Sequence, residues 1–274
     1  MAGPDVHGCG PQWDGHVLLL YEAESERRAG LAAWVRRGLE RGEKVIYADG
    51  PVASQDSLVA VLEATGLDTG AARRDGRLAV LPLEEFYPPA GQDGLVERAL
   101  AEGFSAVRMS AEPTAALTLL APDAYLRTER TMDRLCRTRP VSAMCQYARA
   151  AMTGPALRAT VEAHVVGVRQ TRFATGDIGH GLVLRGEIDL VNADVFAAVV
   201  ATATSHGSGP VWLDLGAVDF LDVAACRALL TASADFRADG GHLLLVAPQL
   251  EVERTMRLLG LAAEPGVQLL GGDP

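Results

Sequence analysis

The side chains best suited to chemistry in this chain are cysteines, histidines and a few carboxylates that follow apolar runs. The four cysteines lie far apart with no CxxC pair, and the six histidines show no spacing typical of a metal site. In a chain of 274 residues, such dispersed cysteines indicate a reducing compartment rather than a disulfide scaffold. We therefore expect no metal site, no cofactor, and buried structural thiols at Cys136, Cys145 and Cys226.

The common catalytic and phosphate-binding motifs are also absent. The sequence has no GxSxG and no HExxH, and no GxGxxG follows the first apolar run. A Walker loop needs a lysine followed by Ser or Thr, but the single lysine, Lys44, precedes Val45. We expect neither nucleotide binding of the usual kinds nor catalysis. The alternative is an enzyme that uses Glu22, Asp49 and Glu112 as acid–base groups.

The composition excludes several broad classes of protein. Hydrophobic residues make up 49% of the chain, which is enough for real cores, and the net charge is −10. An acidic balance argues against binding to nucleic acid or to an anionic membrane, because both need a clustered positive surface. The N-terminal residues lack the features of a signal peptide, and the apolar runs are shorter than the ~20 residues of a membrane span. We expect a soluble, cytoplasmic protein.

The first part of the chain alternates apolar runs with stretches of helical period. The run HVLLLY (His16–Tyr21) is continuous, as in a strand buried on both faces. Further runs follow at Lys44–Asp49, Leu78–Leu83, Ala106–Glu112 and Val141–Tyr147. This alternation predicts an α/β domain with a mostly parallel sheet, at residues 16–168 after a tail at residues 1–15.

The pattern changes after about residue 165, and a second domain is predicted at residues 169–274. Residues 164–190 suit two strands joined by a Gly-rich turn, and a helix follows with Asn192 as its N-cap. The pattern continues with a strand at Val211–Leu215 and a helix over Cys226–Phe236, and it ends with a strand, a helix and a final strand. These elements predict a compact α/β domain.

Two constellations are candidate binding sites. In open parallel sheets ligands bind beyond the carboxyl ends of the strands, so a small-molecule pocket is predicted at Tyr21, Glu22, Asp49, Glu112, Gln146 and Tyr147. The alternative is that polar residues simply begin where strands end. In DFLDVAACRALL (Asp219–Leu230), Asp222 is placed to cap a helix and to expose its first turn as a docking or phosphate site. The alternative there is an ordinary strand–helix junction.

The second domain resembles a STAS domain, the fold of anti-sigma factor antagonists, through LVLRGEIDLVNADVFAAVV (Leu182–Val200) and VWLDLGAVDFLDVAACRALL (Val211–Leu230). In that family the Asp is followed by two Ser/Thr and a Gly, and a partner kinase, itself the anti-sigma factor, phosphorylates the second hydroxyl. Here Asp222 matches, but Val223, Ala224 and Ala225 replace the three that follow. The phosphoacceptor position is therefore Ala224, which has no hydroxyl.

The first domain resembles the MEDS sensory domain, a RecA-like module without a working phosphate loop. The matching segments are HVLLLY, GLERGEKVIY (Gly38–Tyr47), GFSAVRMSAEPT (Gly103–Thr114) and CQYARAAM (Cys145–Met152). The chain departs from the family at Pro113, where Met is usual, and at Ala148, where Asp is usual. These departures imply altered or lost sensing if the two positions line a pocket.

Together the resemblances imply a non-catalytic regulatory protein similar to an anti-sigma factor antagonist. Its partner would be a GHKL-type anti-sigma kinase, bound through Asp222, Val223, Ala224, Ala225 and Arg227. A neutral alanine resembles the unphosphorylated, binding-competent state, so control would lie with the sensory domain or with expression. The alternative is a small-molecule sensor whose second domain docks on another partner or on a second copy of the chain.

Overall fold

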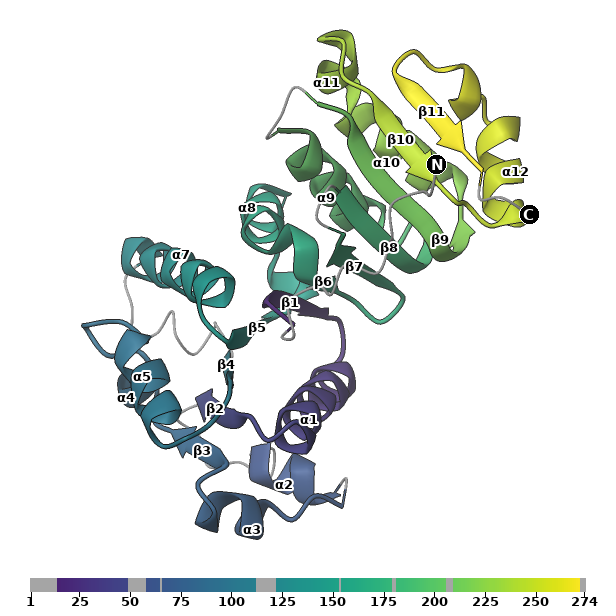
Figure 1. Cartoon of the computed structure of the whole chain (residues 1–274). Helices are drawn as coiled ribbons and strands as arrows, with labels where there is room; N and C mark the ends of the chain where they lie inside the picture. The colour runs from purple at the N-terminus through teal and green to yellow at the C-terminus, as the bar shows by residue number, and fades with distance from the viewer. Residues whose placement is uncertain are drawn as a thin grey trace, which may run out of the picture. The chain divides into compact units, whose positions relative to one another are not determined.

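The computed structural model describes residues 14–48, 58–64, 66–111, 122–152, 154–178, 181–205 and 209–271, which form two compact units (Figure 1). The first unit comprises the described residues within 14–152, and the second those within 154–271. Within these described ranges, no helix is both long enough and apolar enough to cross a membrane.

The first unit is built from alternating strands and helices. In chain order its elements are β1 (His16–Tyr21), α1 (Glu24–Glu40), β2 (Lys44–Ala48), α2 (Leu58–Ala64), α3 (Thr69–Arg74), β3 (Leu78–Leu81), α4 (Leu83–Phe86), α5 (Asp93–Ala101), β4 (Val107–Ala111), α7 (Pro122–Thr138) and β5 (Val141–Ala148). The strands lie in the order β1-β5-β4-β2-β3, and every neighbouring pair is parallel. The predicted parallel α/β sheet is confirmed.

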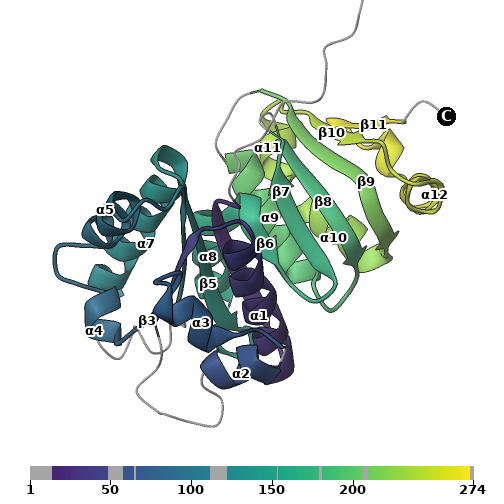
Figure 2. The same ribbon diagram turned by 60° about the horizontal axis from the view of Figure 1, so that its bottom comes forward.

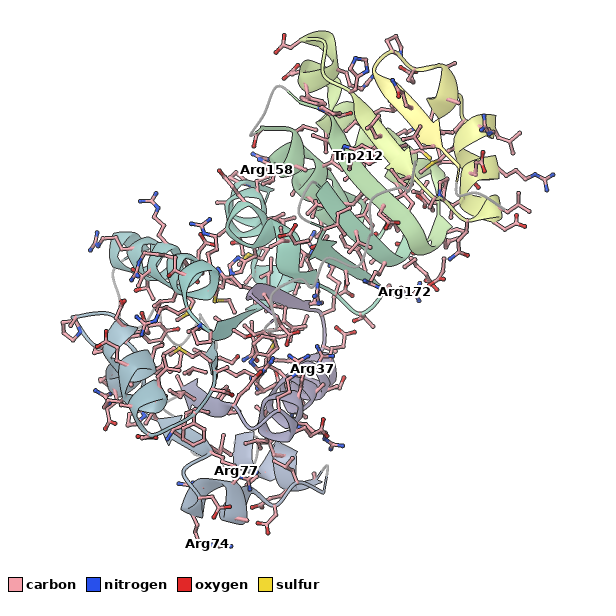
Figure 3. The ribbon with its side chains drawn as sticks, viewed as in Figure 1. Arg37, Arg74, Arg77, Arg158, Arg172 and Trp212 are labelled. Atoms are coloured by element: carbon pink, nitrogen blue, oxygen red, sulfur yellow. The ribbon has the colours of Figure 1, made fainter. Side chains whose placement is uncertain are left out.

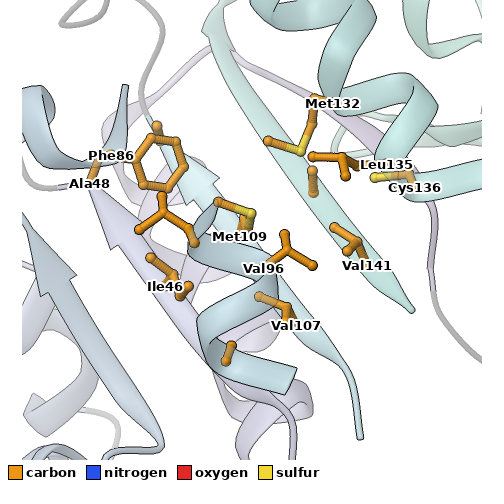
Figure 4. Close-up of a cluster of buried hydrophobic side chains, with 14 of the residues drawn as sticks. Ile46, Ala48, Phe86, Val96, Val107, Met109, Met132, Leu135, Cys136 and Val141 are labelled. Atoms are coloured by element: carbon orange, nitrogen blue, oxygen red, sulfur yellow. The ribbon is translucent and has the colours of Figure 1, made fainter. Parts of the chain in front are cut away.

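Helices cover both faces of this sheet, with α1 on one side and α5 and α7 on the other (Figure 1). Successive strand residues point to opposite faces, so each strand contributes to two cores. On β2, Val45 and Tyr47 pack toward α1, whereas Ile46 packs toward α5 among the side chains of Figure 4. Full burial of each such aliphatic side chain contributes about 1.5–3 kcal/mol, which explains the continuous apolar runs of the sequence.

One buried charge interrupts the core on the α1 side. Arg108 of β4 is fully buried, and its guanidinium lies 2.5 Å from Glu43 and 2.7 Å from Asp14. The same group stacks on the Trp34 ring, 4.2 Å from the ring centre. Gly38 of α1 permits this arrangement, because an added Cβ there would lie 2.7 Å from Arg108 Cδ. A buried arginine held by two carboxylates ties α1 and the loop before β2 to the middle of the sheet.

The second unit contains a mixed sheet. Its elements are α8 (Gly154–His164), β6 (Val168–Arg169), β7 (Phe173–Asp177), β8 (Gly181–Ile188), α9 (Ala193–Ser205), β9 (Val211–Leu221), α10 (Val223–Ala232), α11 (Ala234–Ala238), β10 (Leu243–Val246), α12 (Leu250–Leu258) and β11 (Val267–Leu270). The strand order is β11-β10-β9-β8-β7-β6, in which β7 is antiparallel to both neighbours and the other pairs are parallel. Helices α9 and α10 lie side by side against this sheet (Figure 2).

The chain around Asp222 follows the prediction that a strand passes directly into a helix, but the elements on either side differ in length from the predicted runs. The strand predicted at Val211–Leu215 continues through Leu221, paired with β8 across irregular register near Gly186. Helix α10 begins at Val223, directly after the predicted cap Asp222, but the helix predicted to run through Phe236 is interrupted at Ser233 between α10 and α11. The buried Ser233 hydroxyl donates to the Leu229 carbonyl at 2.7 Å, so it satisfies a carbonyl at the end of α10.

Candidate functional site

Asp222 caps the N-terminus of α10, as the strand–helix junction predicts. Its backbone is extended, and its Oδ1 accepts a hydrogen bond of 2.8 Å from the Ala225 N–H. Its Oδ2 accepts a second bond, of 3.1 Å, from the Leu190 N–H in the segment between β8 and α9. One carboxylate therefore joins the start of α10 to a neighbouring segment and satisfies two backbone donors.

The segment between β8 and α9 is fixed by its own polar side chains. Asn192 Oδ1 accepts from the Asp189 N–H at 3.0 Å, and its Nδ2 donates to the Glu187 carbonyl at 2.9 Å. Asp189 Oδ1 accepts from the Val191 N–H at 2.9 Å. As predicted, Asn192 directly precedes α9, and its carbonyl accepts from the Phe196 N–H in the first turn; its side chain bonds backwards and does not cap the helix. Leu190 and Val191 are consequently displayed on an ordered turn.

Apolar side chains surround the capped helix end. Leu190 is 77% exposed, Val191 63%, Phe220 50% and Val223 45%. We call Leu190, Val191, Phe220 and Val223 the docking patch. Phe220 lies two residues before Asp222 at the end of β9, and Val223 directly follows Asp222. The bond between the Leu190 N–H and Asp222 therefore brings these chain positions close together. Large exposed apolar side chains gathered at one place typically mark an interaction surface.

The residues predicted for partner binding differ in exposure. Val223 and Arg227 are exposed, Ala224 is half-buried, and Ala225 is buried, where its N–H serves the cap. The first hydroxyl along α10 is that of Thr231, two turns beyond Ala224. Sequence reasoning missed Leu190, Val191 and Phe220, because adjacent apolar residues and an alternating strand pattern are just as typical of buried positions.

Charged groups border the docking patch. The Arg172 guanidinium, labelled in Figure 3, lies 3.2 Å from Glu187 and 3.6 Å from Asp189. On the buried side of α10, burial and the charge of Asp222 raise the pKa of the Cys226 thiol to about 12. The thiol is therefore neutral at physiological pH.

In the first unit, the predicted strand-end residues divide between the two faces of the sheet. The buried amide of Gln146 donates to the Ser110 hydroxyl at 2.8 Å and accepts from Arg27 of α1 at 3.4 Å. Tyr147 points to the other face, where its hydroxyl donates to Glu129 of α7 at 3.4 Å. Tyr21 is half-buried at the end of β1 and Glu22 is exposed beyond it. Asp49 and Glu112 lie outside the described residues.

The fold also brings together three residues that no spacing in the sequence connects. His16 of β1, Glu129 of α7 and Cys145 of β5 lie with their polar atoms 3.4–3.6 Å apart. Because β1 and β5 are neighbours in register, His16 and Cys145 share the α7 face of the sheet although they are far apart in the sequence. The expectation of scattered histidines without metal-ligand spacing overlooked this arrangement.

A groove lies elsewhere in the first unit, against β2 and α5. Its volume is about 540 Å³. Its lining includes Lys44, Glu84, Glu85, Arg98 and Glu102, with Ile46 and Leu95 at its apolar base. Lys44 is already paired there, 2.6 Å from Glu102. The volume suits a small molecule, and the charged rim is of mixed sign.

These observations define a protein of two modules: a parallel α/β module followed by a mixed α/β module with an apolar docking patch. The family model of the MEDS domain, described as the methanogen/methylotroph, DcmR sensory domain, matches residues 15–165, and that of the STAS domain matches residues 177–269. The chain belongs to the MEDS family, and its MEDS domain is followed by a STAS domain.

Comparison with solved structures finds similar chains. The chain is similar to a candidate anti-sigma factor antagonist from Thermotoga maritima, with 22% identity and a TM-score of 0.31. The match covers 36% of this chain and 86% of the other. Comparison with curated proteins finds no match.

Proposed function

We propose that this chain is a non-catalytic regulatory protein that acts as an anti-sigma factor antagonist. Its STAS domain binds a GHKL-type anti-sigma kinase through the docking patch, with Asp222 and Arg227 at the edges of the contact. The observation that carries the proposal is the set of exposed apolar side chains around the capped end of α10. The resemblance to STAS antagonists implies that this helix end is where the family carries its phosphoacceptor. Neither family description names a catalytic activity.

Ala224 determines how this contact is controlled. A phosphate would add about −1.5 to −2 charges beside the Asp222 carboxylate and the apolar docking patch, where repulsion and desolvation would oppose docking. Ala224 cannot accept a phosphate, so the surface stays in its binding-competent form. Control therefore passes to the MEDS domain, which senses a small molecule, or to the amount of protein made. The described cysteines are free thiols, in keeping with a reducing, cytoplasmic location.

The test is a titration calorimetry screen of the full chain against each GHKL-type anti-sigma kinase of the source organism. Val223→Asp and Phe220→Asp place a charge in the docking patch without removing a buried group. Leu258→Asp is the matched control, because Leu258 is an exposed leucine on α12, 78% exposed, in the same unit. We expect binding by the wild type and the control, and a loss of more than about tenfold in both patch variants.

Two outcomes would overturn the proposal. One is that no kinase binds the wild type, and the other is that Leu258→Asp weakens binding as much as the patch variants do. If both patch variants bind the kinase as the wild type does, the contact lies away from the end of α10.

A second candidate function is a small-molecule sensor whose STAS domain docks on another protein or on a second copy. The groove lined by Lys44, Glu84 and Arg98 favours it, since its volume of about 540 Å³ is typical of small-ligand sites. Native mass spectrometry of the purified chain would reveal a retained small molecule. Light scattering of the wild type and of Val223→Asp would reveal self-association through the docking patch.

A further inference from the structure

Three ionisable side chains converge on the α7 face of the first unit. His16 Nε2 lies 3.4 Å from Glu129 Oε2 and 3.6 Å from Cys145 Sγ. Cys145 Sγ lies 3.5 and 3.6 Å from the two oxygens of Glu129. Each residue comes from a different element, namely β1, α7 and β5, and the two strands are paired. The sheet and its covering helix thus fix one nitrogen, one oxygen and one sulfur around a common centre.

The burial of His16 and Glu129 beside the half-buried Cys145 calls for compensation. The side chains of His16 and Glu129 are 3% and 9% exposed. A buried imidazole and carboxylate beside a half-buried thiol are costly unless the three are hydrogen-bonded or coordinate a metal ion. A divalent cation satisfies all three at once, because it binds imidazole, carboxylate and thiolate directly.

The separations agree with tetrahedral zinc. With Zn–N and Zn–O bonds of about 2.0–2.1 Å and a Zn–S bond of about 2.3 Å, the nitrogen–oxygen edge of a tetrahedron is about 3.4 Å. The two edges that end on sulfur are about 3.6 Å. The corresponding separations among His16, Glu129 and Cys145 are 3.4, 3.6 and 3.5–3.6 Å. All three edges of the ligand triangle match without any movement of the backbone.

A small cavity adjoins the same groups. It is lined by Glu129 and Cys145 together with Tyr87, Met109 and Met132, and its volume is about 20 Å³. That is room for about one water molecule. Tyr147 adds support from outside the triangle, since its hydroxyl donates to Glu129 Oε1 at 3.4 Å and orients the carboxylate.

We infer that His16, Glu129 and Cys145 ligate one divalent transition-metal ion of zinc type in the MEDS domain. The mixed nitrogen, oxygen and sulfur set suits a borderline-soft ion and disfavours Mg²⁺ and Ca²⁺, which take oxygen ligands. On binding, the Cys145 thiol loses its proton to solvent and the freed sulfur pair bonds to the ion, with no change of oxidation state. The inference is independent of the proposed STAS function.

The test uses the full chain, stripped with a chelator under reducing conditions and then titrated with Co²⁺ or Zn²⁺. Cobalt bound to a thiolate gives a near-ultraviolet charge-transfer band, and tetrahedral cobalt gives intense visible bands. We expect both bands to saturate at one equivalent and to disappear when Zn²⁺ displaces cobalt. Cys145→Ser should remove the charge-transfer band, and His16→Gln should weaken binding by more than roughly tenfold.

Matched controls separate this site from other thiols and histidines. Cys226→Ala removes a buried cysteine of the second unit and should leave the titration unchanged. The double variant His7→Ala/Cys9→Ala removes a closely spaced histidine and cysteine near the N-terminus, and it should also bind the metal ion normally. The inference is overturned if wild-type protein shows no thiolate band, if Cys145→Ser keeps it, or if the band follows His7 and Cys9. If circular dichroism shows that Cys145→Ser does not fold, the cobalt spectra of the wild type and of His7→Ala/Cys9→Ala still test the inference.

Discussion

The Asp222 carboxylate joins the first turn of α10 to the backbone of Leu190, which it holds at 3.1 Å. Through this bond the segment between β8 and α9 and the start of α10 present one surface, on which Leu190 and Val223 lie to either side of the acid. The Asp that resembles the family position is thus an organiser of the docking patch. It does this whether or not a hydroxyl follows it.

Removing this carboxylate should lower both stability and binding. Asp222→Ala loses a helix cap, which is typically worth about 1 kcal/mol, together with the bond to Leu190. We expect the free energy of unfolding in urea to fall by about 1–2 kcal/mol, and binding of the anti-sigma kinase to weaken. Asp219→Ala is the control, since Asp219 is exposed and its contact is a 3.4 Å bond from Gln249. A similar loss in both variants would contradict a special role for Asp222.

Gly38 should be intolerant of a methyl group. A Cβ added at this position would lie 2.7 Å from Arg108 Cδ and 2.8 Å from Val45 Cγ2, so Gly38→Ala must shift α1 or the buried arginine. We expect a loss of about 1–3 kcal/mol in the free energy of unfolding. The matched substitution is Gly94→Ala in α5, where the nearest contact is the far end of Arg98 at 3.9 Å. That variant should gain about 0.4–1 kcal/mol, because a helix prefers alanine.

Asp14 should make part of the stability of the first unit dependent on pH. Burial alone would raise the pKa of its carboxyl, but the bond to Arg108 and the charges of Arg108, Arg37 and Arg41 hold the pKa below its ordinary value of 3.8. The folded state thus favours the ionised form. The contribution of ionised Asp14 to the free energy of unfolding is fully present above about pH 4 and is lost as the pH falls through the acid range.

This pH dependence can be measured by urea unfolding between pH 7 and pH 3. Asp14→Asn should lose stability at pH 7 and approach the wild type at the acid end. Asp75→Asn is the comparison, because Asp75 forms an exposed pair with Arg77 that is worth little. If the free energy of unfolding of Asp14→Asn stays parallel to that of the wild type at every pH, the ion pair between Asp14 and Arg108 does not stabilise the folded state.

Tyr147→Phe tests the metal site without touching a ligand. The substitution removes the hydroxyl that donates to Glu129 and leaves the ring in place. Loss of a group that orients a metal ligand typically costs about 10–100-fold in affinity. We expect a Zn²⁺ affinity lowered by roughly tenfold, measured by competition with a chromophoric chelator, with the cobalt thiolate band intact. An unchanged affinity would show that Tyr147 does not orient the carboxylate.

The sequence predicts the fold where the physical signal is local. Continuous apolar runs such as His16–Tyr21 identify the parallel strands, and Asp222 is recognisable as a cap from its place between a strand and a helix. Although the passage from strand to helix at Asp222 is predictable, the continuity of β9 through Gly216 is not, because a glycine followed by alternating residues resembles a turn. Nor is the break at Ser233, which depends on a hydroxyl bonding back to Leu229.

The same difference between local signals and long-range contacts applies to the candidate sites. Ala224 is recognisable from the order of residues after Asp222, but the exposure of Leu190 and Phe220 depends on how two segments meet. The cluster of His16, Glu129 and Cys145 is not visible in the sequence at all. It exists because β1 pairs with β5, and because α7 lies over that edge of the sheet.

The central claim is that the docking patch binds its kinase regardless of phosphorylation, and one experiment tests it directly. The affinity of the full chain for the cognate anti-sigma kinase is measured before and after incubation with that kinase and ATP. The account predicts unchanged affinity and no phosphate within residues 222–227, whereas Ala224→Ser becomes phosphorylated and binds more weakly. Phosphate on the wild-type chain in that segment, or binding that ATP abolishes, would contradict it.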